Sequence, residues 1–173
     1  MQGSFEASLP QRVARSSRVS LQNVIPSHWF SAAASECYEM YVAGYFYGTI
    51  SIAQAYVETL SQYLCQLYKI RGSKNNAVDR WIRLQREKLV GLDACSAAIA
   101  VLSDRNDFHH LNTAVEQEHT KLETRAEECM NMLHRIESDV FAHTFDNGQV
   151  VLARPERWPA AGEGLVRIQL RNK

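Results

Sequence analysis

The sequence predicts a mainly α-helical protein, an up-and-down bundle of four to five helices with a small C-terminal β-hairpin or antiparallel sheet. Apolar residues recur at alternating steps of four and three between Phe46 and Leu67, as on one face of a helix packed lengthwise in a bundle. A second stripe of this kind ends at Val140. Beyond it the pattern changes to short alternating segments around Asn147-Gly148, which is typical of a tight hairpin turn.

The composition is that of one globular domain. The chain has 173 residues, of which 46% are hydrophobic and 22% charged, so it can bury a core and is too apolar to be disordered. Lys and Arg total 19, as do Asp and Glu, and the net charge therefore gives no indication of a nucleic-acid partner. No stretch is long and apolar enough to cross a membrane, and the N-terminus lacks the apolar core of a secretory signal. We expect a soluble, cytoplasmic protein that does not contact a membrane.

Residues 1–26 are predicted to form an irregular arm, and helical periodicity begins just after it. Ser27 is the predicted N-cap of a first helix that ends near Gly44. A longer second helix follows, and the turn-forming run 71–76 ends it. Its apolar stripe consists of Phe46, Ile50, Ala53, Val57, Leu60, Leu64 and Leu67.

Two shorter helices and a last long one complete the predicted bundle. The third helix is expected over residues 77–90, and the alanine-rich fourth over 93–102, where small side chains favour close packing in the interior. The last helix is expected over 113–140. Its apolar seam consists of Val115, Leu122, Ala126, Cys129, Leu133, Ile136 and Val140. Glu118 falls on this seam, and we expect it at a splayed end of the bundle.

The C-terminal part is predicted to be β-structure. Strands flank Asp146-Asn147-Gly148, and residues 165–170 alternate as a third strand would. The chain is thus divided into the arm 1–26, the helical bundle 27–140 and a hairpin tail 141–173 packed on the bundle. Residues 154–173 hold five basic side chains against two acidic ones, so the tail either binds phosphate or is a solvated end.

No metal or cofactor site is predicted. The four cysteines fall in four different helical segments without a C-x-x-C pair, which favours buried, reduced thiols over a zinc knuckle or redox motif. They are Cys37, Cys65, Cys95 and Cys129. A P-loop, a Gly-rich dinucleotide fingerprint and a nucleophile elbow are absent from the sequence.

One short segment, Arg105-Asn106-Asp107-Phe108-His109-His110, carries residue types that suit RNA cleavage. RNA is cleaved without a metal when its own 2′-hydroxyl attacks the neighbouring phosphate. Histidine suits the proton transfers because its pKa lies near neutrality, and arginine suits the phosphorane because its planar fork of donors stays charged. Asn106 would orient the imidazole or bind substrate. One histidine cannot supply both the acid and the base, so the hypothesis requires a two-fold dimer that brings two copies of the segment together.

The order of these features resembles the HEPN superfamily. A long up-down helix pair, a shorter helix and then R-N-x-x-x-H before the final helix match that family over roughly residues 28–140, with Arg105, Asn106 and His110 in its motif. Many of its members are metal-independent endoribonucleases of toxin–antitoxin, abortive-infection and other defence systems. The resemblance implies a catalytic site of Arg105 and His110, an RNA substrate, a homodimer and an antitoxin or regulatory protein partner. The family also has members without catalytic activity, and the arm and tail lie outside the resemblance.

The choice of active histidine depends on where the helix starts. On an uninterrupted helix, residues four apart nearly align, so Arg105 would share a face with His109 and not with His110. His110 is the first choice and requires Arg105 at or before the helix start, which Ser103 or Asp104 as N-cap would permit. His109 is the reserve.

Other interpretations of these residues remain open. The segment could be the plain polar start of a helix. The same bundle could be a non-catalytic dimeric binding or regulatory module for a nucleotide or a protein. His119, near Glu116 and Glu118, could suggest a metal site, although a solvated helix face is the simpler interpretation. Four tyrosines near the turn after the first helix could stack bases, but bundle packing and a dimer interface explain them better. They are Tyr38, Tyr41, Tyr45 and Tyr47.

Overall fold

The computed structural model describes residues 2–70, 76–109 and 119–158. It confirms the predicted fold class, because the described chain is mainly helical and has a small two-stranded antiparallel sheet toward its C-terminal end. None of the helices in this described part is both long enough and apolar enough to span a membrane.

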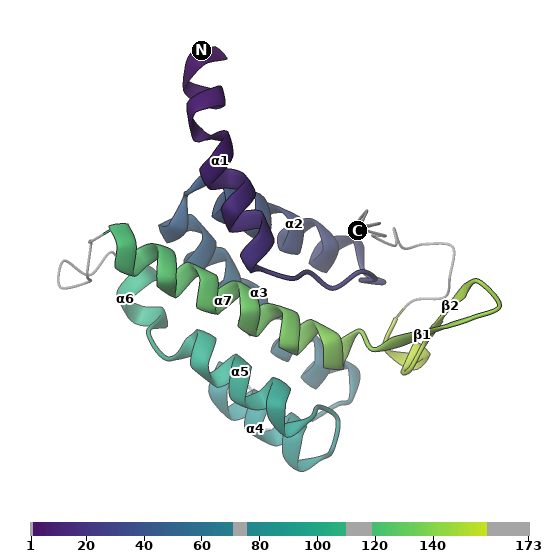
Figure 1. The fold of residues 1–173 in the computed structure, drawn as a ribbon. Coiled ribbons are helices and arrows are strands. Elements are labelled where there is room, and N and C mark those ends of the chain that lie inside the picture. Colours follow the sequence, from purple (N-terminus) through teal and green to yellow (C-terminus); the bar gives the residue numbers. More distant parts are fainter. Residues whose placement is uncertain (1, 71–75, 110–118, 159–173) are drawn as a thin grey trace.

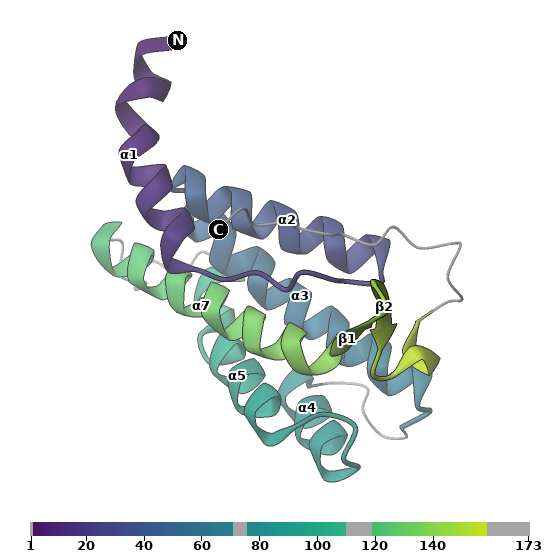
Figure 2. The same ribbon diagram turned by 45° about the vertical axis from the view of Figure 1, so that its right-hand side comes forward.

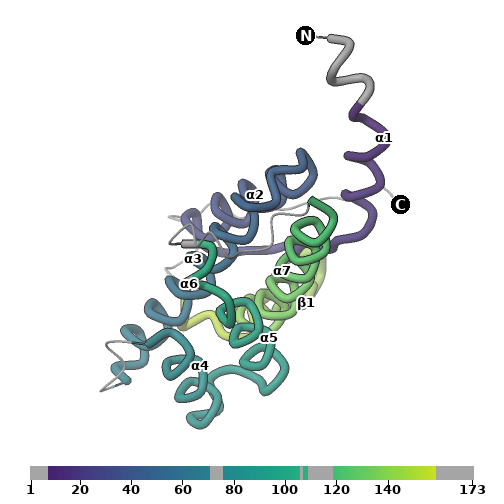
Figure 3. Tube along the Cα trace, turned by 90° about the vertical axis from the view of Figure 1, so that its left-hand side faces the viewer, coloured from purple at the N-terminus to yellow at the C-terminus, as the bar shows by residue number. Residues whose placement is uncertain are grey.

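The helices form three tiers (Figures 1 and 3). In the middle lie α3 (Phe46–Leu67) and α7 (His119–Val140), which pack against each other. On one side are α1 (Gln2–Arg18) and α2 (His28–Ala43), and on the other are α4 (Ala77–Arg86) and α5 (Leu92–Leu102). The short helix α6 (Arg105–His109) follows α5 and contacts α3.

The predicted stripes form the core. Along α3 every predicted position from Phe46 to Leu64 is at most 3% exposed, and only Leu67 at the helix end reaches 38%. The described positions of the α7 seam from Ala126 to Val140 are at most 2% exposed. In α4, Trp81 is fully buried and its indole nitrogen donates to the backbone oxygen of Val57, 3.2 Å away. The positions Val115 and Glu118 lie outside the described residues.

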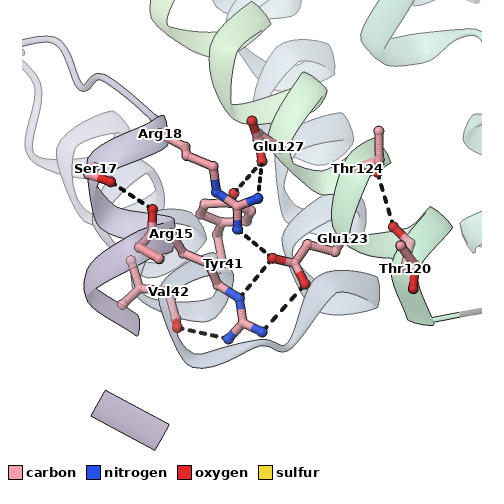
Figure 4. Close-up of polar contacts among 10 residues, drawn as sticks. Arg15, Ser17, Arg18, Tyr41, Val42, Thr120, Glu123, Thr124 and Glu127 are labelled. Atoms are coloured by element: carbon pink, nitrogen blue, oxygen red, sulfur yellow. Dashed lines mark hydrogen bonds and ion pairs between the residues drawn. The ribbon is translucent and has the colours of Figure 1, made fainter. Parts of the chain in front are cut away.

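The expectation of an irregular N-terminal arm is wrong for residues 2–18, which form α1. Tertiary ion pairs hold the end of this helix on α7, as Figure 4 shows. Arg15 Nε lies 3.2 Å from Glu123 Oε1, and Arg18 lies 3.2 Å from Glu127 and 2.5 Å from Glu123. These partners are more than 100 residues away along the chain, so no local pattern could indicate them.

Residues 19–26 follow α1 without regular structure and lie along the bundle toward the start of α2 (Figure 2). Val19, Leu21, Val24 and Ile25 are nevertheless buried, at most 7% exposed. The arm is therefore part of the packed domain.

The hairpin prediction is confirmed. Strand β1 (His143–Asp146) pairs antiparallel with β2 (Gln149–Leu152), and Asp146 faces Gln149 across the turn. Asn147 and Gly148 have φ angles of 48° and 78°, as a type I′ turn requires at both central positions. The predicted third strand over 165–170 lies outside the described residues.

A short 3₁₀ turn, Pro155–Arg157, follows β2 and returns the chain to the bundle. The ring of Trp158 stacks on Tyr63 with centroids 5.5 Å apart, and it also packs on Phe141. All four cysteines are free and buried, as predicted.

Candidate functional site

The candidate site lies at α6, between the end of α5 and the start of α7. Arg105 is the first residue of this helix, which meets the condition set by the choice of His110. The structure describes the backbone but not the side chains of Asn106 and His109, and His110 lies outside the described residues. Of the four predicted site residues, Arg105 is therefore the one whose side chain can be placed.

Asp104 anchors the start of α6 to the bundle. Its carboxylate accepts two hydrogen bonds from Arg125 on α7, from Nε at 2.8 Å and Nη2 at 2.9 Å, and a third from the amide of buried Gln54 at 2.9 Å. Arg125 also donates to the backbone oxygen of Ala100. The hydrogen bonds that Arg125 donates to Asp104 raise the pKa of Arg125, against the opposing effect of burial.

Neither the Ser103 nor the Asp104 side chain acts as the expected N-cap of α6. The hydroxyl of Ser103 donates back to Ala100, and the Asp104 carboxylate is used by Arg125 and Gln54. The backbone of Asp104 supports the helix start instead, since its carbonyl accepts from the N–H of Asp107 at 3.1 Å. Nothing in the local sequence indicates that a partner on another helix competes for the carboxylate.

Phe108 fixes the other end of α6. Its ring is 6% exposed and packs on Tyr47 with centroids 5.5 Å apart. The Tyr47 hydroxyl also donates to the backbone oxygen of Phe108. Because Asp104 and Phe108 are both held by neighbouring helices, the backbone that carries Arg105 is fixed on both sides.

Arg105 forms an ion pair with Glu58 on α3. Its Nη2 lies 2.7 Å from Glu58 Oε2, and the two side chains are 38% and 32% exposed. Glu58 also faces the buried Arg80 at 3.6 Å, and Arg80 in turn donates to Ser61. One carboxylate thus lies between two guanidinium groups.

A small cavity of about 210 Å³ opens beside this ion pair. Its lining consists of Glu58, Asn76, Ala77, Val78, Leu102, Ser103 and Arg105. Within the described part of the chain, Arg105 Nε is buried without an acceptor, and Nη2 is occupied by Glu58. The Arg105 side chain is 38% exposed and borders this cavity, so an incoming anion can approach the guanidinium there.

Sequence reasoning missed Glu58, although a signal was present. The 22 residues of α3 contain no other charged side chain. A single carboxylate in an otherwise uncharged helix, packed against several neighbours, needs a cationic partner. That observation would have indicated Glu58 before the structure was known, but it would not have identified Arg105 and Arg80 as its partners.

Several of the remaining candidates make packing or hydrogen-bond contacts where they are described, whereas Tyr45 is 68% exposed. The His119 ring packs edge-on against Phe46 with centroids 4.8 Å apart, and Glu116 and Glu118 lie outside the described residues. No group of three or more potential metal ligands occurs within residues 2–70, 76–109 and 119–158. Tyr41 is fully buried and donates to Glu127 at 2.9 Å.

Comparison of this chain with protein-family models, with curated proteins and with solved structures found no match.

Proposed function

We propose that the protein is a metal-independent endoribonuclease of the HEPN kind that acts as a homodimer, with Arg105 and His110 as catalytic residues and Asn106 in support. The observation that carries this proposal is the placement of Arg105. Its guanidinium is partly exposed, borders an open cavity and sits on a helix fixed at Asp104 and Phe108. A preorganised cation of this kind stabilises charge without having to reorganise during the reaction.

The proposed reaction is a transesterification. The 2′-oxygen of the RNA attacks the adjacent phosphorus while a histidine removes the hydroxyl proton. The O2′–P bond forms, the P–O5′ bond breaks, and a second histidine protonates the leaving oxygen. The products are a 2′,3′-cyclic phosphate and a 5′-hydroxyl. In a two-fold dimer the two histidines are the His110 residues of the two protomers, with His109 as the reserve, and Arg105 neutralises the phosphorane.

The ion pair between Arg105 and Glu58 favours a second candidate function. A carboxylate at 2.7 Å neutralises much of the charge that would attract a phosphate. A non-catalytic dimeric module that binds a nucleotide or a protein can keep this ion pair permanently. An endoribonuclease must share the guanidinium between Glu58 and its substrate.

The deciding experiment is cleavage of a generic RNA pool in the presence of EDTA. We expect wild-type protein to release 2′,3′-cyclic phosphate ends, and Arg105→Ala and His110→Ala to abolish cleavage with the fold intact. His28→Ala is the matched control, because His28 is exposed on α2 far from this segment in the chain. Cleavage that persists in both variants would overturn the assignment. No cleavage by any of the proteins would favour the binding module.

Two further properties follow from the proposal. Specific activity should fall when the protein is diluted below its dimer dissociation constant, because the site of a monomer has one His110 and lacks either the acid or the base. If the enzyme serves as a toxin or defence effector, a neutralising protein partner that blocks the dimer cleft is expected.

A further inference from the structure

A second cavity, of about 600 Å³, lies between the C-terminal ends of α3 and α4. Its lining consists of Tyr68, Lys69, Ile70, Arg83, Arg86, Glu87 and Leu89. We call it the basic cavity, because three of these side chains are cations and one is a carboxylate. It shares no lining residue with the cavity beside Arg105.

A further cation lies directly beneath this lining. Arg157 is 1% exposed, and its guanidinium donates to the hydroxyl of Tyr68 at 2.8 Å and to the backbone oxygens of Leu89 and Val140. Among the described residues it has no carboxylate partner, which is unusual for a buried charge. Tyr68 and Leu89 both line the basic cavity, so the charge of Arg157 adds to the positive potential there. The carboxylate of Glu156, which accepts from the Tyr68 hydroxyl at 3.3 Å, offsets part of it.

Lys69 adopts a backbone conformation that glycine would favour. The helices α3 and α4 end in the same way, with Lys69 and Lys88 in the left-handed region at φ angles of 53° and 57°. In both, the next residue donates back across the last turn, Ile70 to Cys65 and Leu89 to Leu84. A side chain at such a position carries a conformational cost relative to glycine. Lys69 lines the basic cavity, so there the unfavourable conformation is accompanied by a cation at the cavity, whereas Lys88 is not part of the lining.

The helix α4 connects the two cavities. Ala77 and Val78 at its start line the cavity beside Arg105, and Arg83 and Arg86 in its last turn line the basic cavity. Ten residues of α-helix span about 15 Å. Basic residues in a last turn also offset the helix dipole, but that effect requires neither a cavity nor a buried arginine beneath it.

We infer that the basic cavity binds the phosphodiester backbone of single-stranded RNA and holds a substrate strand along α4 while another part of it reaches Arg105. This inference rests on the proposed endoribonuclease function, since it assigns the holding of the same substrate. Lys69, Arg83 and Arg86 bind the phosphates, and Arg157 strengthens the potential from below. The recognition is electrostatic and independent of base sequence.

The test uses binding and not cleavage. A fluorescein-labelled 12-nucleotide RNA with every 2′-oxygen methylated cannot undergo the transesterification, and its affinity for the full chain is read from fluorescence anisotropy. We expect Arg83→Gln/Arg86→Gln to weaken binding about tenfold at 50 mM salt. The slope of log K against log salt should also fall by about 1.4, which is roughly 0.7 for each phosphate that is no longer neutralised. Arg83→Lys/Arg86→Lys should keep most of the affinity because the charge is retained.

The matched control is Lys121→Gln/Arg135→Gln, which removes two exposed cations of α7 outside the basic cavity. It should change the affinity by less than about twofold. A second pair of variants separates binding from stability. Lys69→Gly and Lys88→Gly relieve the same backbone conformation, so both should raise the melting temperature. Only Lys69→Gly should also weaken binding clearly.

The outcomes distinguish this inference from the proposed function. Wild-type protein that does not bind the blocked RNA, or equal losses in the two double variants, would overturn the inference. If Arg83→Gln/Arg86→Gln bound and cleaved like wild type, the basic cavity would have no part in an otherwise active nuclease. Binding that localises to the basic cavity while no cleavage is found would support the inference and contradict the nuclease.

Discussion

Arg105 Nη2 lies 2.7 Å from Glu58 Oε2, and the same carboxylate faces the buried guanidinium of Arg80 at 3.6 Å. Glu58 therefore does two things. It places a negative charge beside the buried guanidinium of Arg80, and it fixes the direction of the proposed catalytic arginine. Because Glu58 is about one third exposed, water screens the pair, and its contribution to stability is smaller than that of a fully buried ion pair.

We predict that Glu58→Gln lowers the free energy of unfolding by about 1 kcal/mol, because Arg80 keeps its hydrogen bond to Ser61 but loses its carboxylate. If the protein cleaves RNA, kcat should fall about tenfold, equivalent to about 1.4 kcal/mol, with little change in KM, as expected when a group that positions a catalytic residue is lost. Urea denaturation and steady-state cleavage measure the two effects. Glu36→Gln, at an exposed position of α2, should leave both unchanged. A variant at Glu58 that behaves like this control would show that the ion pair has no role.

Asp104 and Arg125 are predicted to be strongly coupled. The pair is bidentate and its side chains are 28% and 18% exposed. Asp104→Ala therefore leaves a half-buried guanidinium without this partner, and the exposed Glu128, 3.4 Å from Arg125 Nη1, replaces it only in part. We expect a loss of about 2 kcal/mol in the free energy of unfolding. A double-mutant cycle with Arg125→Ala measures the coupling. The bidentate pair of Asp93 and Arg135 is the matched control, and its coupling should be far smaller because both side chains are exposed. Equal couplings would contradict the anchoring role of Asp104.

Periodicity predicted the parts of the fold that depend on local pattern. The stripe of α3 is buried because each of its positions faces a neighbouring helix, and the hairpin follows from two residues that tolerate positive φ. Helix α1 was missed because its stabilising partners, Glu123 and Glu127, lie on α7. The spacing of apolar residues predicts which face of a helix is buried, but it does not predict which charged residues on distant helices form ion pairs.

The candidate site shows the same division. Its position between α5 and α7 followed from the order of the predicted elements, and Arg105 does open a helix there. The partners of Arg105 and Asp104 could not be predicted from the sequence, because Glu58, Gln54 and Arg125 belong to other helices. Such pairings depend on the relative rotation of packed helices, which a single sequence does not specify.

The docking of α1 should depend on pH. Burial tends to raise the pKa of Glu123, but the hydrogen bonds from Arg15 and Arg18 outweigh it and lower that pKa below its usual value. A carboxylate whose folded-state pKa is depressed stabilises the fold above the unfolded pKa, near 4.5, and this stability is lost as pH falls through the folded value. We expect the amide hydrogens of residues 11–18 to exchange faster below about pH 4.5, after correction for the intrinsic rate.

Glu123→Gln should release α1 at neutral pH and remove this pH dependence. Glu128 lies on α7, as Glu123 does, but at an exposed position. Glu128→Gln is therefore the control and should leave exchange in α1 unchanged. Protection of residues 11–18 that persists at pH 3 would show that the buried segment 19–26, and not the ion pairs, holds the arm in place.

Cys37 and Cys129 are predicted to be inert in the native protein. Both residues are fully buried, and burial raises the pKa of both thiols, that of Cys129 to about 12. Because the thiolate is the reactive form, Ellman's reagent at pH 8 should label neither until the protein unfolds in urea, as measured in a Cys65→Ser/Cys95→Ser background that removes the other two free thiols. An exposed thiol introduced as Ser96→Cys on α5 is the positive control and should react at once. The cysteines lie on α2 and α7, and Cys37 Sγ contacts Met130 Sδ at 3.5 Å, so the labelling rate reports separation of these helices. Prompt labelling under native conditions would mean that α2 and α7 part without global unfolding, and that the bundle is less cooperative than its continuous core implies.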